Sequence, residues 1–103
     1  MEITAQDFRD GIISEISIGF DWSNNNNFAI LKIKCADSGP KSYRINDLIE
    51  FNIYEDFKAM YIERCTLIKK PNEIYLSLDP FIEDTKAKEK DNYYFNGRSI
   101  EQI

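Results

Sequence analysis

The chain has 103 residues, a hydrophobic fraction of 43% and a formal charge of −5 with no histidine. This length leaves room for one domain with one core, and the composition excludes a disordered chain. The negative charge disfavours nucleic acid and anionic membranes as partners, because both would repel it. We therefore expect one domain, residues 1–103, that binds neither nucleic acid nor membrane.

The first ten residues, MEITAQDFRD, carry acids where a signal peptide needs bases, and no apolar run reaches membrane-spanning length. We expect a cytoplasmic protein in which Cys35 and Cys65 rest as thiols. Isoleucine dominates, valine is absent, and asparagine and lysine are frequent. This usage indicates an AT-rich coding bias and a bacterial or phage source.

The first half of the chain predicts a β-hairpin. Residues 11–20 and 28–36 alternate between apolar and polar side chains, with Ser14 as the polar interruption of the first apolar face. The asparagine-rich stretch 21–27 between them is typical of a turn, because asparagine tolerates left-handed backbone. Trp22 in this turn is expected either to cover the core or to serve as an exposed anchor. The residues predicted to face inward are Ile12, Ile16, Ile18, Phe20, Ala29, Leu31, Ile33 and Cys35.

The middle of the chain continues the strand pattern. Residues 41–55 have an apolar odd-numbered face that only Asp47 interrupts, and the pair Asn46-Asp47 indicates a bulge or a corner between strands. Residues 56–69 fit a short helix capped by Asp56, or a strand from about residue 61 to 69, which the turn after it favours. The predicted inward residues of 41–55 are Tyr43, Ile45, Ile49, Phe51 and Ile53.

The last third predicts two more strands. Residues 73–79 alternate strictly, with Tyr75, Ser77 and Asp79 outward, and the Asp79-Pro80 step ends the strand because proline donates no hydrogen bond. Residues 92–100 form the final strand. Short strands at regular spacing predict an all-β fold, or a β-rich α+β fold if 56–69 is helical. We expect a small antiparallel sandwich or partly open barrel of about six strands.

Most catalytic and metal chemistry lacks the residues that it needs. Without histidine the chain has no Ser-His or Cys-His nucleophile pair, and two cysteines do not fill a structural zinc site. The four glycines are scattered, so there is no glycine-rich phosphate loop. Paired carboxylates could still act as general acid and base, but solvated surface acids are far more frequent. We expect no enzyme, no cofactor and no metal.

The remaining function is binding. Outward acids fall into two groups, around Glu50 and around Asp79, and aromatic residues lie beside them in the sequence, including Tyr93 or Tyr94. Such a surface suits a basic protein partner, because the charges steer association and the rings anchor it. The residues predicted to bind this partner are Glu55, Asp56, Tyr75, Asp79, Phe81, Glu83 and Asp84.

The segments YIERCTLIKKPNEIYLSLDPF and DNYYFNGRSI resemble small all-β immunity proteins of contact-dependent inhibition and other polymorphic toxin systems. The resemblance covers residues 61–103 and the strand rhythm before them. It implies a role and no specific site: neutralisation of a cognate toxin, often a nuclease, in the cytosol. Since such a nuclease is basic, an acidic inhibitor associates with it rapidly.

Two other hypotheses remain open at this point. The same composition fits a non-enzymatic accessory or adaptor protein of a phage or mobile element. Open sheet edges would also allow a homodimer, because an unpaired strand edge can pair with a second copy.

Overall fold

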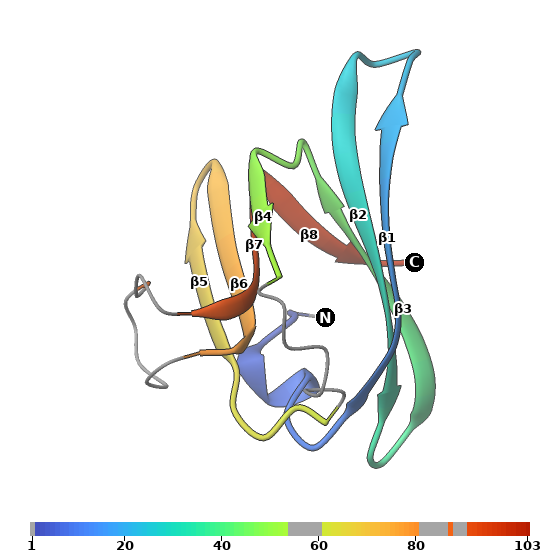
Figure 1. Cartoon of the computed structure of the whole chain (residues 1–103), viewed down its shortest axis with the longest axis vertical. Coiled ribbons are helices and arrows are strands. Elements are labelled where there is room, and N and C mark those ends of the chain that lie inside the picture. Colours follow the sequence, from blue (N-terminus) through green and yellow to red (C-terminus); the bar gives the residue numbers. More distant parts are fainter. Residues whose placement is uncertain (1, 54–60, 81–86, 88–90) are drawn as a thin grey trace.

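The structure is a computed structural model that describes residues 2–53, 61–80, 87 and 91–103. It is an all-β fold of two antiparallel four-stranded sheets, with the orders β1-β2-β3-β8 and β4-β7-β6-β5 (Figure 1). The predicted all-β class is confirmed. The elements are η1 (Ala5–Asp7), β1 (Ile12–Asp21), β2 (Asn26–Cys35), β3 (Gly39–Asn46), β4 (Glu50–Asn52), β5 (Thr66–Lys70), β6 (Glu73–Asp79), β7 (Asn92–Gly97) and β8 (Ser99–Gln102).

Two strands change sheets at a shared corner. β3 continues into β4 past Asp47, whose φ of 50° turns the chain, and β7 continues into β8 beside it. A Cβ atom on Gly97 would lie 2.6 Å from Cγ2 of Ile45 and 2.9 Å from the carbonyl oxygen of Asn46. Glycine is therefore required where the two bent strands cross. The predicted corner at Asn46-Asp47 is confirmed, and it explains why about six predicted strands become eight.

Among the described residues, the start of β1 pairs with the segment that precedes β5. Ile12 and Tyr61 form an isolated antiparallel bridge. The backbone N–H of Ile62 donates to the carbonyl of Gly11 at 2.8 Å, and the N–H of Asp10 donates to the carbonyl of Ile62 at 2.7 Å. The strand predicted from about residue 61 therefore begins later, at Thr66, because residues 61 and 62 bond to the start of β1 instead. Residues 61–69 contain no helix, and residues 56–60 lie outside the described part of the chain.

The core fills the space between the two sheets. Leu31, Ile33, Ile45, Leu76 and Phe95 are fully buried and come from both sheets. The alternation of β2, β3 and β6 places Leu31, Ile33, Ile45 and Leu76 inward, as the sequence predicts. Cys65 is buried and Cys35 is half-buried, and the two cysteines form no disulfide.

At the start of the first strand, the side chains that face inward differ from the predicted ones. The register against β2 shifts between Ile13 and Glu15, so a bulge lies at Ser14. Ile13 is buried at 8% exposure, whereas Ile12, which was predicted to face inward, is 43% exposed. The extra residue of a bulge reverses the faces before it. Beyond the bulge the predicted phase holds, since Ile16 lies opposite the buried Leu31.

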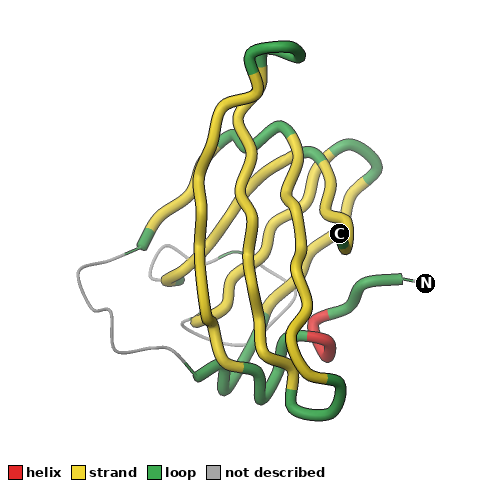
Figure 2. The backbone as a smooth tube through the Cα atoms, turned by 90° about the vertical axis from the view of Figure 1, so that its right-hand side faces the viewer, coloured by secondary structure: helices red, strands yellow, loops and turns green. Residues whose placement is uncertain are grey.

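The β1–β2 hairpin projects past the rest of the molecule (Figures 1 and 2). Gly19 lies opposite Phe28, and the Phe28 ring occupies the space that a Cβ on Gly19 would need, at 2.4 Å. The guanidinium of Arg44 lies 4.1 Å from the centroid of the same ring. An aromatic ring packed over a glycine between strands stabilises a long hairpin. Among the described residues, no helix is long and apolar enough to cross a membrane.

Candidate functional site

The outward side of the β4-β7-β6-β5 sheet carries Tyr75 and Asp79 from the predicted binding set, together with Tyr94 and Glu50. Paired residues on neighbouring strands point to the same face, and Tyr75 lies opposite Asn96 while Ser77 lies opposite Tyr94. We call this surface, formed by the outward side chains of β4 to β7, the tyrosine face. The inward side of the same sheet carries the buried pair Leu76 and Phe95.

Two stacked tyrosines form the centre of the tyrosine face. The rings of Tyr75 on β6 and Tyr94 on β7 lie 5.6 Å apart between centroids, with an interplanar angle of 29°. Tyr93 is buried, so Tyr94 is the outward member of the pair that the sequence left open. Offset stacking of this kind orders both rings before a partner arrives. Ordered aromatic rings lose little side-chain entropy on binding.

A buried carboxylate fixes Tyr75. Its hydroxyl donates to Oδ2 of Asp91 at 2.6 Å, and Asp91 has an exposed fraction of 0%. Burial, the hydrogen bond to Asp91, and the negative charges of Asp91 and Glu50 hold the pKa of Tyr75 well above its usual range. Tyr75 is therefore a neutral hydrogen-bond donor and not a phenolate. Its role on this surface is that of an oriented ring.

The end of β6 is tied to the start of β7. The hydroxyl of Ser77 donates to the carbonyl of Asn92 at 2.8 Å, and the N–H of Asp79 donates to the Ser77 hydroxyl at 3.3 Å. β6 ends at Asp79, as the Asp-Pro step predicts, and Pro80 is buried. The carboxylate of Asp79, half-buried, is thus held at a fixed point at the margin of the tyrosine face.

The two sheets carry different charge on their outward sides. The tyrosine face has three acids from its strands against one base: Glu50, Glu73, Asp79 and Lys70. On the outward side of the other sheet, three acids meet three bases: Glu15, Asp21, Glu101, Lys32, Lys34 and Arg44. Among the strand residues that the structure describes, the excess of acids therefore lies on the tyrosine face, beside the two tyrosines.

Only part of the predicted binding set can be placed. Tyr75 and Asp79 both lie on the tyrosine face, pointing outward as predicted. The other predicted residues lie outside the described part of the chain: Glu55, Asp56, Phe81, Glu83 and Asp84. Sequence reasoning missed Asp91. The sequence does show an acid directly before the aromatic strand 92–96. It does not show that this acid bonds to Tyr75, because the two residues are 16 positions apart.

The structure decides the alternative left open for Trp22 and corrects the prediction for Ile49. Trp22 does not cover the core; it is 87% exposed, because its hairpin extends beyond the opposite sheet. Ile49, predicted to face inward, is 70% exposed. Phe51 points inward as predicted, since it lies opposite the buried Phe95 and stacks on its ring, but it remains 44% exposed. Ile49 and Phe51 follow the corner at Asp47, after which β4 forms the edge of its sheet and is only partly covered.

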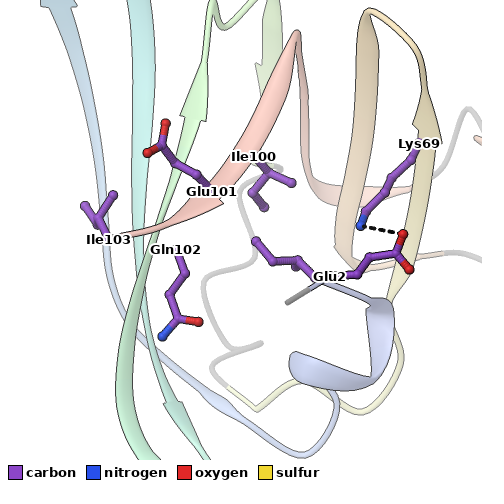
Figure 3. Close-up of a pocket in the computed structure, with 7 residues that line it drawn as sticks. Glu2, Lys69, Ile100, Glu101, Gln102 and Ile103 are labelled. Carbon is purple, nitrogen blue, oxygen red and sulfur yellow. Dashed lines mark ion pairs between the residues drawn. The ribbon is translucent and has the colours of Figure 1, made fainter.

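An open hollow of about 610 Å³ lies between β5 and β8 (Figure 3). Nζ of Lys69 approaches Oε1 of Glu2 to 3.9 Å there, with the Glu2 side chain 78% exposed. The remaining lining comes from Ile3 and the last four residues of the chain. Charged groups this exposed lack the desolvation that prepares an acid or a base for catalysis.

The described residues contain no group of three or more His, Cys, Asp or Glu side chains that could hold a metal ion. Comparisons with protein families, with curated proteins and with solved structures gave no match. Function is therefore inferred from the residues of this chain.

Proposed function

We propose that this chain is an immunity protein that binds a basic bacterial toxin domain, such as a nuclease, through the tyrosine face and thereby neutralises it. The observation that carries the proposal is the coincidence of acid excess and ordered tyrosines on one sheet. Three strand acids against one base lie around the stacked Tyr75 and Tyr94.

The acids and the rings have separate roles in this binding. Glu50 and Asp79 raise the rate of encounter with a basic surface, since complementary potentials act before contact. Tyr75 and Tyr94 supply the contact area, and the hydrogen bond from Tyr75 to Asp91 keeps the ring in place. Tyrosine is among the residue types that dominate binding energy at interfaces. A neutralising protein needs both rapid association and slow release.

The proposed role does not use chemistry on the partner. The phenol of Tyr75 stays protonated at neutral pH, so it cannot act as a base. Binding across the toxin's basic surface would exclude its anionic substrate, because both compete for the same cations. The inhibitor therefore acts as a charge mimic of the nucleic acid and not as an enzyme.

The experiment uses the product of the open reading frame adjacent to this gene. We expect that product to be toxic when expressed alone, and co-expression of the present chain to restore growth. If the product is not toxic, or if it is toxic and the chain neither binds nor rescues, the proposal fails. The accessory or adaptor hypothesis would then account better for the composition.

Matched charge reversals test the face itself. The double variant Glu50→Lys with Asp79→Lys alters the tyrosine face, whereas Asp37→Lys with Glu2→Lys makes the same change in net charge elsewhere. We expect the first pair to slow association with the toxin by roughly tenfold or more at low salt. The second pair should leave the rate within about twofold, and equal effects would refute the placement.

A further inference from the structure

The outer edge of β1 is open along most of its length. Ile12 bridges to Tyr61, but from Glu15 to Asp21 the described residues pair with β1 on its β2 side only. An edge strand of this kind presents a row of unpaired N–H and C=O groups to solvent. Seven residues give an edge of roughly 20 Å.

In the part of the chain that the structure describes, the usual protection of an edge strand occurs at one end of β1 only. Proteins commonly protect such edges with lysine, proline, bulges or a covering segment. β1 has its bulge at Ser14, next to the end that Tyr61 already joins. The segment 15–21 contains no lysine, arginine or proline. Among the residues that the structure describes, none pairs with the outer edge of segment 15–21, so its backbone can pair with another chain.

Uncovered apolar side chains lie along the same strand. Ile18 and Phe20 point to the inward side of their sheet, yet they are 42% and 38% exposed. They remain exposed because the hairpin projects past the opposite sheet (Figure 1). Trp22 stacks edge-on against Phe20, with centroids 4.6 Å apart, and is 87% exposed. An exposed tryptophan beside a phenylalanine is typical of an anchor for a protein partner.

The charges on β1 indicate which kind of strand would pair with its edge. Both charged residues of β1, Glu15 and Asp21, are acids. Nδ2 of Asn24 donates to Asp21 at 2.8 Å, which holds the pKa of that carboxyl below its usual range. Lys32 approaches Glu15 to 3.7 Å, but both side chains are about half exposed, so this pair is weak. The edge therefore favours a cationic strand.

A second copy of this chain fits the edge poorly. Antiparallel self-pairing centred on Ile18 would place each Glu15 opposite an Asp21 of the other copy, and like charges opposite each other destabilise a sheet. Two chains of charge −5 also repel each other at long range.

We propose that the β1 edge binds an extended segment of another protein, in which apolar and basic side chains alternate, as an added strand beside Glu15–Asp21. The apolar side chains would lie on the side of Ile18 and Phe20, and the basic ones on the side of Glu15 and Asp21, because side chains of a strand alternate between faces. This surface belongs to the other sheet from the tyrosine face. The inference therefore does not depend on the proposed function.

The test is an NMR titration of the full ¹⁵N-labelled chain with the peptide acetyl-Lys-Ile-Lys-Ile-Lys-Ile-Lys-amide. We expect chemical-shift changes and slowed amide hydrogen exchange in residues 15–22 of the chain. A peptide with all of its backbone amides N-methylated has no N–H to donate to the ladder and should bind at least about tenfold more weakly. A peptide with glutamate in place of lysine should also bind more weakly. Equal binding of all three peptides, or no binding at millimolar concentration, overturns the proposal.

Variants of the chain locate the site. Ile18→Lys should abolish the shift changes, whereas Ile49→Lys, at an exposed position just before β4, should leave the peptide affinity unchanged. The wild-type spectrum of residues outside β1 serves as the check that each variant folds. Shift changes centred away from β1 overturn the proposal. So does a dimer of the chain alone, seen by sedimentation, that Ile18→Lys dissociates, because the edge would then bind a second copy.

Discussion

Replacing Tyr75 with phenylalanine tests whether the buried carboxylate under the tyrosine face matters. The variant removes the hydroxyl that donates to Oδ2 of Asp91 at 2.6 Å while keeping the ring. Asp91 has an exposed fraction of 0%, so water cannot easily replace the lost donor. Hydrogen bonds to charged groups contribute about 1.5–3 kcal/mol, and we expect a loss of about 2 kcal/mol in the free energy of unfolding.

The chain offers a matched control. The hydroxyl of Tyr61 donates to Oδ1 of Asp10 at the same distance, 2.6 Å, but Tyr61 is 55% exposed and Asp10 is also exposed. Solvent can satisfy both groups after Tyr61→Phe, so the loss should stay below about 0.5 kcal/mol. The two bonds differ mainly in burial, which makes the comparison a direct measure of desolvation.

Thermal and urea unfolding of the two variants measure these losses in the free energy of unfolding. Unfolding entropy scales with length, at about 0.2 kcal/mol per kelvin for 103 residues. A loss of 2 kcal/mol therefore lowers Tm by about 10 °C for Tyr75→Phe, against about 2 °C or less for Tyr61→Phe. Equal losses in the two variants would refute the reasoning, because burial of Asp91 would then have no energetic consequence.

Three further predictions follow from burial and protonation. Leu76→Ala, at 0% exposure, should cost about 2–5 kcal/mol, whereas Ile49→Ala, at 70% exposure, should stay within about 0.5 kcal/mol in urea unfolding. Thr66→Val should stabilise the fold by about 1 kcal/mol, because the buried Thr66 hydroxyl has no hydrogen-bond partner; Ser77→Ala should destabilise it, because its hydroxyl is bonded. The pKa of Tyr75 is raised in the folded state, so the group contributes stability below pH 10 that is lost as the pH rises further. The difference in unfolding free energy between wild type and Tyr75→Phe should therefore shrink by about 1 kcal/mol between pH 9 and 11. A constant difference would contradict the raised pKa.

The strand pattern of this chain is predictable wherever the alternation is unbroken. The bounds of β6, Glu73–Asp79, match the prediction because apolar residues recur strictly and proline ends the run. The alternation of apolar and polar residues did not predict which side chains at the start of β1 face inward. A bulge at Ser14 shifts the register by one residue, and the polar interruption in the sequence did not reveal its direction.

Exposure depends on features that periodicity does not contain. Trp22 and Ile49 lie on apolar strands or beside them, but their burial is set by how far the hairpin projects and where the corner directs β4. The tyrosine face was predictable in part: Tyr75 and Asp79 point outward as expected. The hydrogen bond between Tyr75 and Asp91 was not, because it depends on the pairing of β6 with β7.

The most direct test of the proposed function is the association rate between the product of the adjacent open reading frame and the matched charge-reversal pairs. The account predicts roughly tenfold slower association at low salt for Glu50→Lys with Asp79→Lys, and a nearly unchanged rate for Asp37→Lys with Glu2→Lys. An equal reduction in both pairs would mean that only net charge matters. That result, or the absence of any complex, would contradict binding through the tyrosine face.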